Sequence, residues 1–230
     1  LNEFELSEKF NKKIIKEVEK INIKIEEKEI KKRRDFRNIL TFTIDPEDAK
    51  DFDDAISIKH LYEKEYEVGI HIADVTHYVK ERSITDNEAK NRATSVYLVD
   101  RVISMLPEKI SNHICSLRPN EEKLTFSAVF KIDLEGEVKE SWFGKSIIES
   151  KRRFTYKEVE KILNKENKKK NIEKVLEKVN QIAKRLRKKR NENGSINFEK
   201  KEVKFFLNKK KEQKKKKLKE SNQATKLIEE

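Results

Sequence analysis

The sequence predicts a mixed α+β fold in which β-sheets pack against helices. Two observations support this: apolar residues alternate at period two in several short runs, and they recur at helical spacing in others. The clearest alternating run, residues 124–132, turns at Glu135-Gly136 and returns as residues 138–148, which predicts a hairpin. The clearest helical run covers residues 172–190. With 230 residues the chain is long enough to bury a hydrophobic core.

The first part of the chain predicts a helix followed by three strands. Residues 8–34 carry a sparse apolar stripe, so we expect residues 1–35 to form a helical lead-in to a domain over residues 36–230. From Ile39 the period changes to two, and this strand runs directly into Asp45-Pro46. Residues 55–58 and 66–72 predict two more strands.

The remaining elements follow from the same rules. A helix is expected from Ser83 or Thr85 to about Arg92, followed by an irregular segment through Pro107 and Pro119. A second set of predictions covers the C-terminal half: helices at 156–163 and 172–190 around an insertion at 164–171, a hairpin at 196–207, and a capped helix from 221.

The lysine-rich segment at about 208–220 predicts a solvated loop, disordered at 209–217. The first residue is Leu1 and the only methionine is Met105, so we expect a piece of a longer protein.

The composition favours a polyanionic partner and a reducing compartment. Lys and Arg outnumber Asp and Glu by 55 to 43, giving a net charge of +12, although a general lysine bias on the surface explains the charge equally well. The single cysteine, Cys115, excludes an internal disulfide and a multi-cysteine zinc site and is expected to be a buried thiol. No run approaches the roughly 18 apolar residues of a membrane span. We therefore expect a cytoplasmic protein without a membrane partner.

Four carboxylates stand within ten residues at the end of the first predicted strand: Asp45, Asp51, Asp53 and Asp54, here named the aspartate cluster. Like charges at close range repel unless a cation neutralises them, and hard oxygen ligands select Mg²⁺ or Mn²⁺. Phe52 suggests that the loop is anchored in a core. The alternative is a set of solvent-exposed loop carboxylates. A calcium-binding EF-hand loop is excluded, because the segment lacks an Asp-x-Asp-x-Asp-Gly run with a Glu at the twelfth position.

The two histidines His71 and His77 do not predict a shared metal ion. Their even separation places them on one face of an extended strand, but about 20 Å apart. We interpret His71 as a strand histidine with satisfied hydrogen bonds and His77 as at most an indirect neighbour of the acidic site.

The segment TIDPEDAKDFDDA at residues 43–55 resembles the signature of the RNase II/RNase R family almost position for position. The likeness continues through VGIHIADVTHYV at 68–79, ATSVYLVDRVI at 93–103 and CSLRPN at 115–120, and it is closer to bacterial RNase R than to RNase II. It is dense from about residue 30 to 163 and thinner from 194 onwards. The resemblance implies a partial RNB-type catalytic domain, with mixed sheets and packed helices around an RNA channel.

The resemblance implies that Asp45, Asp51, Asp53 and Asp54 match the family's aspartates that hold Mg²⁺ at the scissile phosphate, with Mn²⁺ as an alternative. The one matching Asp53 is indispensable. One ion would activate the attacking water and the other would stabilise the leaving 3′ oxygen. The expected activity is processive 3′→5′ hydrolysis of single-stranded RNA to nucleoside 5′-monophosphates, by a monomer acting on the RNA 3′ end.

The resemblance also assigns RNA-binding residues: Tyr97 as the tyrosine that clamps the terminal base, Tyr156 as a further RNA contact, Phe198 as the phenylalanine stacking from the other side, and Glu230 as a nucleotide contact. Base stacking is sequence-tolerant and contributes about 1–3 kcal/mol per base. For each aromatic side chain, packing in the core is the alternative.

The sequence departs from the family pattern in three respects. The downstream Thr-Ser-Pro-Ile-Arg segment and the OB-fold domains at either end of the family's chains are absent, and Ser104 stands where proline is usual. A truncated, catalytically impaired RNA-binding remnant is therefore the alternative function. A third alternative is a hydrolase of another class or a calcium-binding protein, which would have only the acidic loop in common with the family.

Overall fold

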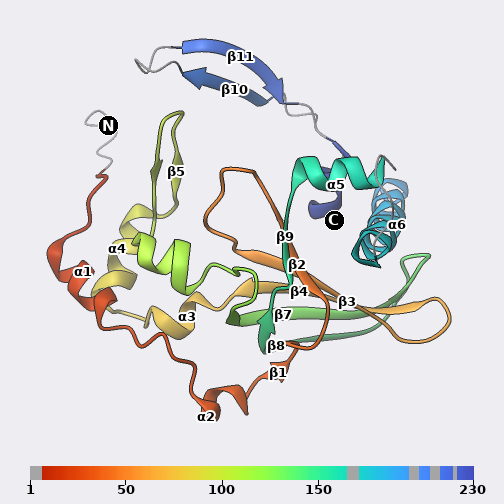
Figure 1. Ribbon diagram of the computed structural model, residues 1–230, viewed down its shortest axis with the longest axis horizontal. Coiled ribbons are helices and arrows are strands. Elements are labelled where there is room, and N and C mark those ends of the chain that lie inside the picture. Colours follow the sequence, from red (N-terminus) through yellow and green to blue (C-terminus); the bar gives the residue numbers. More distant parts are fainter. Residues whose placement is uncertain (1–6, 165–170, 197–201, 208–212, 220–221) are drawn as a thin grey trace.

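The computed structural model describes residues 7–164, 171–196, 202–207, 213–219 and 222–230. Within these ranges the fold is built on a seven-stranded sheet of order β1-β8-β7-β4-β3-β2-β9 (Figure 1). Its strands are β1 Arg34–Asp35, β2 Thr41–Asp45, β3 Asp54–His60, β4 Glu65–Ala73, β7 Glu122–Asp133, β8 Val138–Glu149 and β9 Arg152–Thr155. The pairs β1·β8 and β2·β9 are parallel and the others antiparallel, so the predicted mixed sheet of an α+β fold is confirmed.

Helices cover the sheet through two hydrophobic cores. One core joins the sheet to α1 Lys12–Glu19 and to the π-helix η2 Lys109–Ile114, with Ile14, Val18, Ile110 and Ile114 buried beside Phe36. The other joins β2 and β3 to three helices: α5 Tyr156–Leu163, α6 Asn171–Glu192 and α7 Gln223–Ile228. Figure 1 shows α1, α3 Val75–Tyr78 and α4 Ile84–Arg92 at one end of the molecule, and α5 and α6 at the other.

Several predicted elements are confirmed with their local signals. The β7–β8 hairpin turns at Gly136, whose φ of +75° lies in the left-handed region that glycine adopts without strain. Helix α4 is capped by Ser83, whose side chain accepts from the backbone N–H of Asp86 at 3.1 Å. Helix α5 begins with a capping box between Thr155 and Glu158. Local side-chain chemistry therefore fixes these element boundaries.

The single helix expected over residues 8–34 is wrong, because the structure has α1 and a short α2 Glu27–Ile30 with a non-helical segment between them. Ile21, Ile23 and Ile25 follow one another at period two, which does not build a helical stripe, and they are β-branched. The side chain of Asn22 accepts from the backbone N–H of Lys24 at 3.0 Å, a local bond that competes with helix formation.

The lysine-rich segment was expected to be a loop, and the structure places strand β11 Gln213–Lys219 in it. This strand pairs antiparallel with β10 Glu202–Leu207, so the hairpin predicted within residues 196–207 finds its partner further along the chain. The ladder joins backbone groups, which every residue except proline supplies in full, so a charged segment can form it.

The sequence did not predict β9, η2 or the pairing of β5 Val96–Tyr97 with β6 Val102–Ile103 in a two-stranded ribbon. None of the described helices combines the length and the apolar character needed to span a membrane.

Candidate active site

The aspartate cluster lies where two central strands meet a connecting segment, here named the acidic loop, residues 45–54. Asp45 is the last residue of β2 and Asp54 is the first residue of β3. The side chain of Asp45 is buried, with only 6% of the residue exposed, and it accepts a hydrogen bond of 2.5 Å from Thr43. A buried carboxylate at a strand end is unusual, because charged groups are rarely buried without a partner.

The acidic loop is fixed to the body of the domain through Phe52. The Phe52 side chain is buried in the first core, its backbone N–H donates to Ser116 Oγ at 3.1 Å, and its carbonyl accepts from Leu117 at 2.8 Å. Ser116 Oγ in turn donates to the carbonyl of Lys50 at 2.9 Å. The predicted anchoring of Phe52 in a core is therefore confirmed, and it fixes the backbone on both sides of Asp51.

The electrostatics show that the four carboxylates share one environment. The pKa of Asp45 is raised to about 6, chiefly by burial and in part by the charges of Asp54 and Asp51, while the hydrogen bond from Thr43 lowers it. Burial also raises the pKa of Asp53, with contributions from Asp51 and Asp54, and burial raises the pKa of Asp54. Asp53 nevertheless remains accessible to water. The cluster is thus neither spread over open surface nor fully enclosed.

The donor set fits a hard divalent cation, although the side chains do not converge on one point. Four carboxylates supply only oxygen ligands, and the raised pKa values of Asp45, Asp53 and Asp54 indicate burial and mutual repulsion that a cation would offset. Among the described residues, no three His, Cys, Asp or Glu side chains are grouped as they would be around a metal ion. Bringing three carboxylates onto one ion therefore requires rotation between staggered side-chain rotamers, which the water-accessible Asp53 permits.

Both predicted tyrosines reach this cluster from different elements. Tyr97, at the end of β5, is 67% exposed and its hydroxyl donates to Asp51 Oδ2 at 3.2 Å. Tyr156 is the first residue of α5, and burial together with the charges of Asp54 and Asp45 raises its pKa. The exposure of Tyr97 argues against core packing as its explanation. The RNA contacts of both tyrosines stay predictions.

Of the other two predicted RNA-binding residues, the structure describes Glu230, and its ion pairs lie on α6. Phe198 lies outside the described residues. The side chain of Glu230 is 4% exposed and accepts from Arg187 Nε at 2.9 Å and from Arg190 Nη2 at 2.7 Å, both on α6. This double ion pair occupies the carboxylate that the resemblance assigns to a nucleotide.

Arg153 is a cation of this site that was not predicted from the sequence. It lies on β9, its Nη2 donates to the carbonyl of Pro46, and its charge lowers the pKa of Asp45 against the effect of burial. Its position three residues before Tyr156 was a possible signal, but nothing in the sequence showed that β9 pairs with β2.

His71 is a satisfied strand histidine, as predicted. It is fully buried, its Nδ1 lies 2.6 Å from Ser127 Oγ and its Nε2 lies 2.8 Å from Ser57 Oγ. Burial lowers the pKa of His71 to about 3, so the ring is neutral at physiological pH. His77 contacts a different group, with its Nδ1 3.6 Å from Glu29 Oε1. The two histidines therefore have separate partners in the structure.

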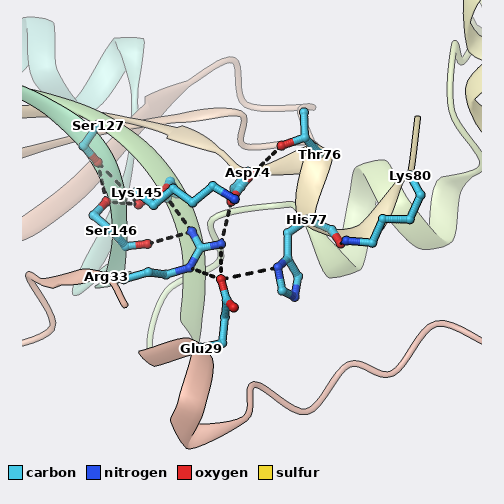
Figure 2. Close-up of polar contacts among 10 residues, drawn as sticks. Glu29, Arg33, Asp74, Thr76, His77, Lys80, Ser127, Lys145 and Ser146 are labelled. Atoms are coloured by element: carbon cyan, nitrogen blue, oxygen red, sulfur yellow. Dashed lines mark hydrogen bonds and ion pairs between the residues drawn. The ribbon is translucent and has the colours of Figure 1, made fainter. Parts of the chain in front are cut away.

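A buried ion-pair network joins α2 to the edge of the sheet (Figure 2). The side chain of Arg33 is fully buried, and its Nη2 lies 2.7 Å from Asp74 Oδ2 while its Nε donates to Glu29 at 2.9 Å. Its Nη1 donates to the carbonyls of Thr125 at 3.1 Å and Ser146 at 3.3 Å. Because each charge is paired and hydrogen-bonded, this network is a structural junction.

Comparison with known proteins places this geometry in context. Residues 33–230 match the RNB domain family. The chain is 51% identical over 140 residues to DIS3-like exonuclease 2 of Schizosaccharomyces pombe, covering 60% of this chain and 15% of that protein. It is 41% identical over 217 residues to Ribonuclease R 1 of Lactococcus lactis, covering 91% of this chain and 26% of that protein. It thus spans about a quarter or less of these two relatives.

The fold also matches a solved structure. Mycoplasma genitalium RNase R in complex with ribose-methylated single-stranded RNA superposes with a TM-score of 0.89 at 28% identity, over 96% of this chain and 35% of that chain.

Proposed function

The chain belongs to the RNB domain family, and from that premise we propose that its acidic loop is the catalytic centre of a 3′→5′ exoribonuclease. The observation that carries the proposal is the shared environment of the four aspartates, with the exposed Tyr97 bonded to Asp51 beside them. A cluster of carboxylates with raised pKa values next to an exposed aromatic side chain suits phosphodiester cleavage at a stacked nucleotide.

Asp45, Asp51, Asp53 and Asp54 are proposed to hold Mg²⁺, with Mn²⁺ as an alternative. The bound metal would supply an activated water and charge stabilisation for the leaving oxygen. The protein's own contribution is to hold the carboxylates in place: Thr43 orients Asp45, and Phe52 with Ser116 fixes the backbone beside Asp51 and Asp53. Because Asp45 has a pKa of about 6, a cation that binds its ionised form gains affinity as the pH rises through that value.

The proposed substrate is the 3′ end of single-stranded RNA, and the proposed products are nucleoside 5′-monophosphates released processively. The phenol ring of Tyr97 would stack on the terminal base, which accepts any base because each has a π-face. Tyr156 approaches the same carboxylates from α5 and would contact the neighbouring nucleotide. The net charge of +12 supports binding to a polyanion. A monomer in the cytoplasm remains our expectation for the assembly and its location.

The test is cleavage of 5′-end-labelled single-stranded RNA by the protein with Mg²⁺ and with EDTA. We expect a ladder of RNA products that shortens from the 3′ end in the presence of Mg²⁺ and no cleavage in EDTA. Asp53→Asn replaces a charged metal ligand with a neutral amide at a water-accessible position. It should reduce the cleavage rate at least about 100-fold, while RNA binding in EDTA is retained. Asp48→Asn, an exposed acidic residue of the same loop, is the matched control and should leave the rate unchanged. RNA that is bound but never shortened would instead identify a binding module.

A further inference from the structure

Arg153 spans the acidic loop from the neighbouring strand. Strand β9 runs parallel to β2, with Arg153 paired in register with Thr43. From there its guanidinium reaches the far side of Asp45, where Nη2 donates to the carbonyl of Pro46. This bond holds the first peptide that follows β2. Arg153 is therefore attached to the start of the acidic loop.

The same guanidinium also contacts the other half of the loop. Its central carbon lies 5.3 Å from the centroid of the Phe52 ring, within the range of a cation–π contact. Phe52 stands between Asp51 and Asp53 and is buried in the first core. A single planar side chain thus touches Pro46 and Phe52, six positions apart, which one lysine ammonium could not do with equal geometry.

Packing alone does not account for this side chain. The Nε of Arg153 is buried and has no hydrogen-bond partner within the described part of the chain. Leaving a buried donor unpaired lowers stability, so another interaction must retain the arginine. The charge of Arg153 acts on Asp45, as described above, and the carboxylate of Asp45 is also repelled by Asp54 and Asp51. Attraction between the guanidinium and Asp45 supplies the missing interaction.

The neighbouring arginine shows what the same residue type does without this role. Successive side chains of a strand point to opposite faces, and Arg152 lies over the ring of Phe154 at 4.2 Å with Nη2 3.5 Å from Glu158 Oε1. Its ion pair joins it to helix α5. Arg152 is therefore a matched control for charge, strand and cation–π contact.

We propose that Arg153 is a positioning residue that clamps both halves of the acidic loop and so sets the mutual placement of its carboxylates. The clamp itself is a property of the fold, and its consequence for metal binding rests on the proposed function. The expected phenotype is a loop that loosens locally, together with carboxylates that no longer present a common site.

The test compares Arg153→Gln, Arg153→Lys and Arg152→Gln. Amide hydrogen exchange without metal or RNA should be at least about tenfold faster in residues 47–54 of Arg153→Gln, with strands β7 and β8 unchanged. Affinity for Mn²⁺, measured by electron paramagnetic resonance, should fall by about tenfold or more, as for other residues that orient metal ligands. Arg153→Lys keeps the charge and should recover part of both effects. Arg152→Gln should behave as wild type in both measurements.

Several outcomes would overturn the clamp. Exchange in residues 47–54 within twofold of wild type in Arg153→Gln would do so, as would an equal increase over the whole sheet. If Arg153→Gln fails to fold, Arg153→Lys decides: an exchange increase confined to the loop supports the clamp, and unchanged exchange refutes it. Because the exchange measurement contains neither metal nor RNA, its result is separate from whether wild-type protein cleaves RNA.

Discussion

Replacing Asp45 with asparagine should stabilise the metal-free protein while abolishing catalysis. The pKa of Asp45 rises from 3.8 to about 6 on folding, chiefly because the carboxylate is buried. At 1.36 kcal/mol per pKa unit, this shift corresponds to about 3 kcal/mol of destabilisation by the ionised form. Relaxation of the cluster and water reaching Asp53 reduce the effect, so we expect a gain of about 1–3 kcal/mol and a rise in Tm of roughly 3–10 °C.

The sign of the pH dependence follows from the direction of the shift. A carboxyl group whose folded-state pKa is raised destabilises the fold only when it is ionised. The destabilisation is absent below pH 3.8, grows between pH 3.8 and about 6, and is complete above that value. The Tm difference between Asp45→Asn and wild type should therefore be small near pH 4 and reach its plateau above about pH 6. Asparagine retains a carbonyl oxygen for the hydrogen bond from Thr43.

Differential scanning fluorimetry at half-unit steps from pH 4 to pH 8 in EDTA measures this difference. Asp48→Asn, on the exposed part of the acidic loop, is the control and should show no such rise. Addition of Mg²⁺ should raise the Tm of wild type more than that of Asp45→Asn, because the ion binds the folded carboxylates. An Asp45→Asn protein that is no more stable than wild type at pH 8 in EDTA, or a difference that does not change with pH, would refute the reasoning.

Three further predictions concern other parts of the molecule. Arg33→Met should destabilise the fold by about 3–5 kcal/mol in urea titrations because it leaves Asp74 charged and buried, whereas Arg34→Met, whose side chain is 37% exposed, should cost less than about 1 kcal/mol. Tyr97→Ala should weaken single-stranded RNA binding in EDTA by about 1–3 kcal/mol in fluorescence anisotropy titrations, and Tyr97→Phe should retain most of the affinity because it keeps the ring; equal losses would exclude stacking. Burial raises the pKa of Cys115 to about 12, so the thiol should not react with a disulfide reagent at pH 8 until the protein is unfolded, and rapid reaction of the native state would contradict its burial.

The elements that the sequence predicted are those with local signals. The β7–β8 hairpin combines clean alternation with a glycine turn, and α5 starts at a capping box that can be seen as Thr155 and Glu158. The acidic loop was found for the same reason, since its four aspartates lie within ten residues. In each case the information that determines the structure lies within a short window of the chain.

What the sequence did not predict depends on contacts between distant segments. Strand β9 has four residues and pairs with β2 more than a hundred positions earlier, so it shows no period of its own. The bond from Arg153 to Pro46 follows from that pairing and from nothing local. Ser116 lies in the CSLRPN motif at 115–120, yet its hydrogen bonds to the acidic loop could not be derived from spacing.

These long-range contacts have a common physical origin in the repulsion within the aspartate cluster. Four neighbouring carboxylates, of which Asp45, Asp53 and Asp54 have raised pKa values, would drive a free loop apart, so their placement needs attachments that do not depend on the loop itself. The structure provides three: β2 holds Asp45, the 116–117 segment holds Phe52, and β9 supplies the cation of Arg153. A site that lowers the stability of the fold is thus maintained by contacts in the surrounding sheet. For this reason Asp45→Asn, which removes the repulsive charge, should stabilise the metal-free protein, whereas Arg153→Gln, which removes an attachment, should loosen the acidic loop.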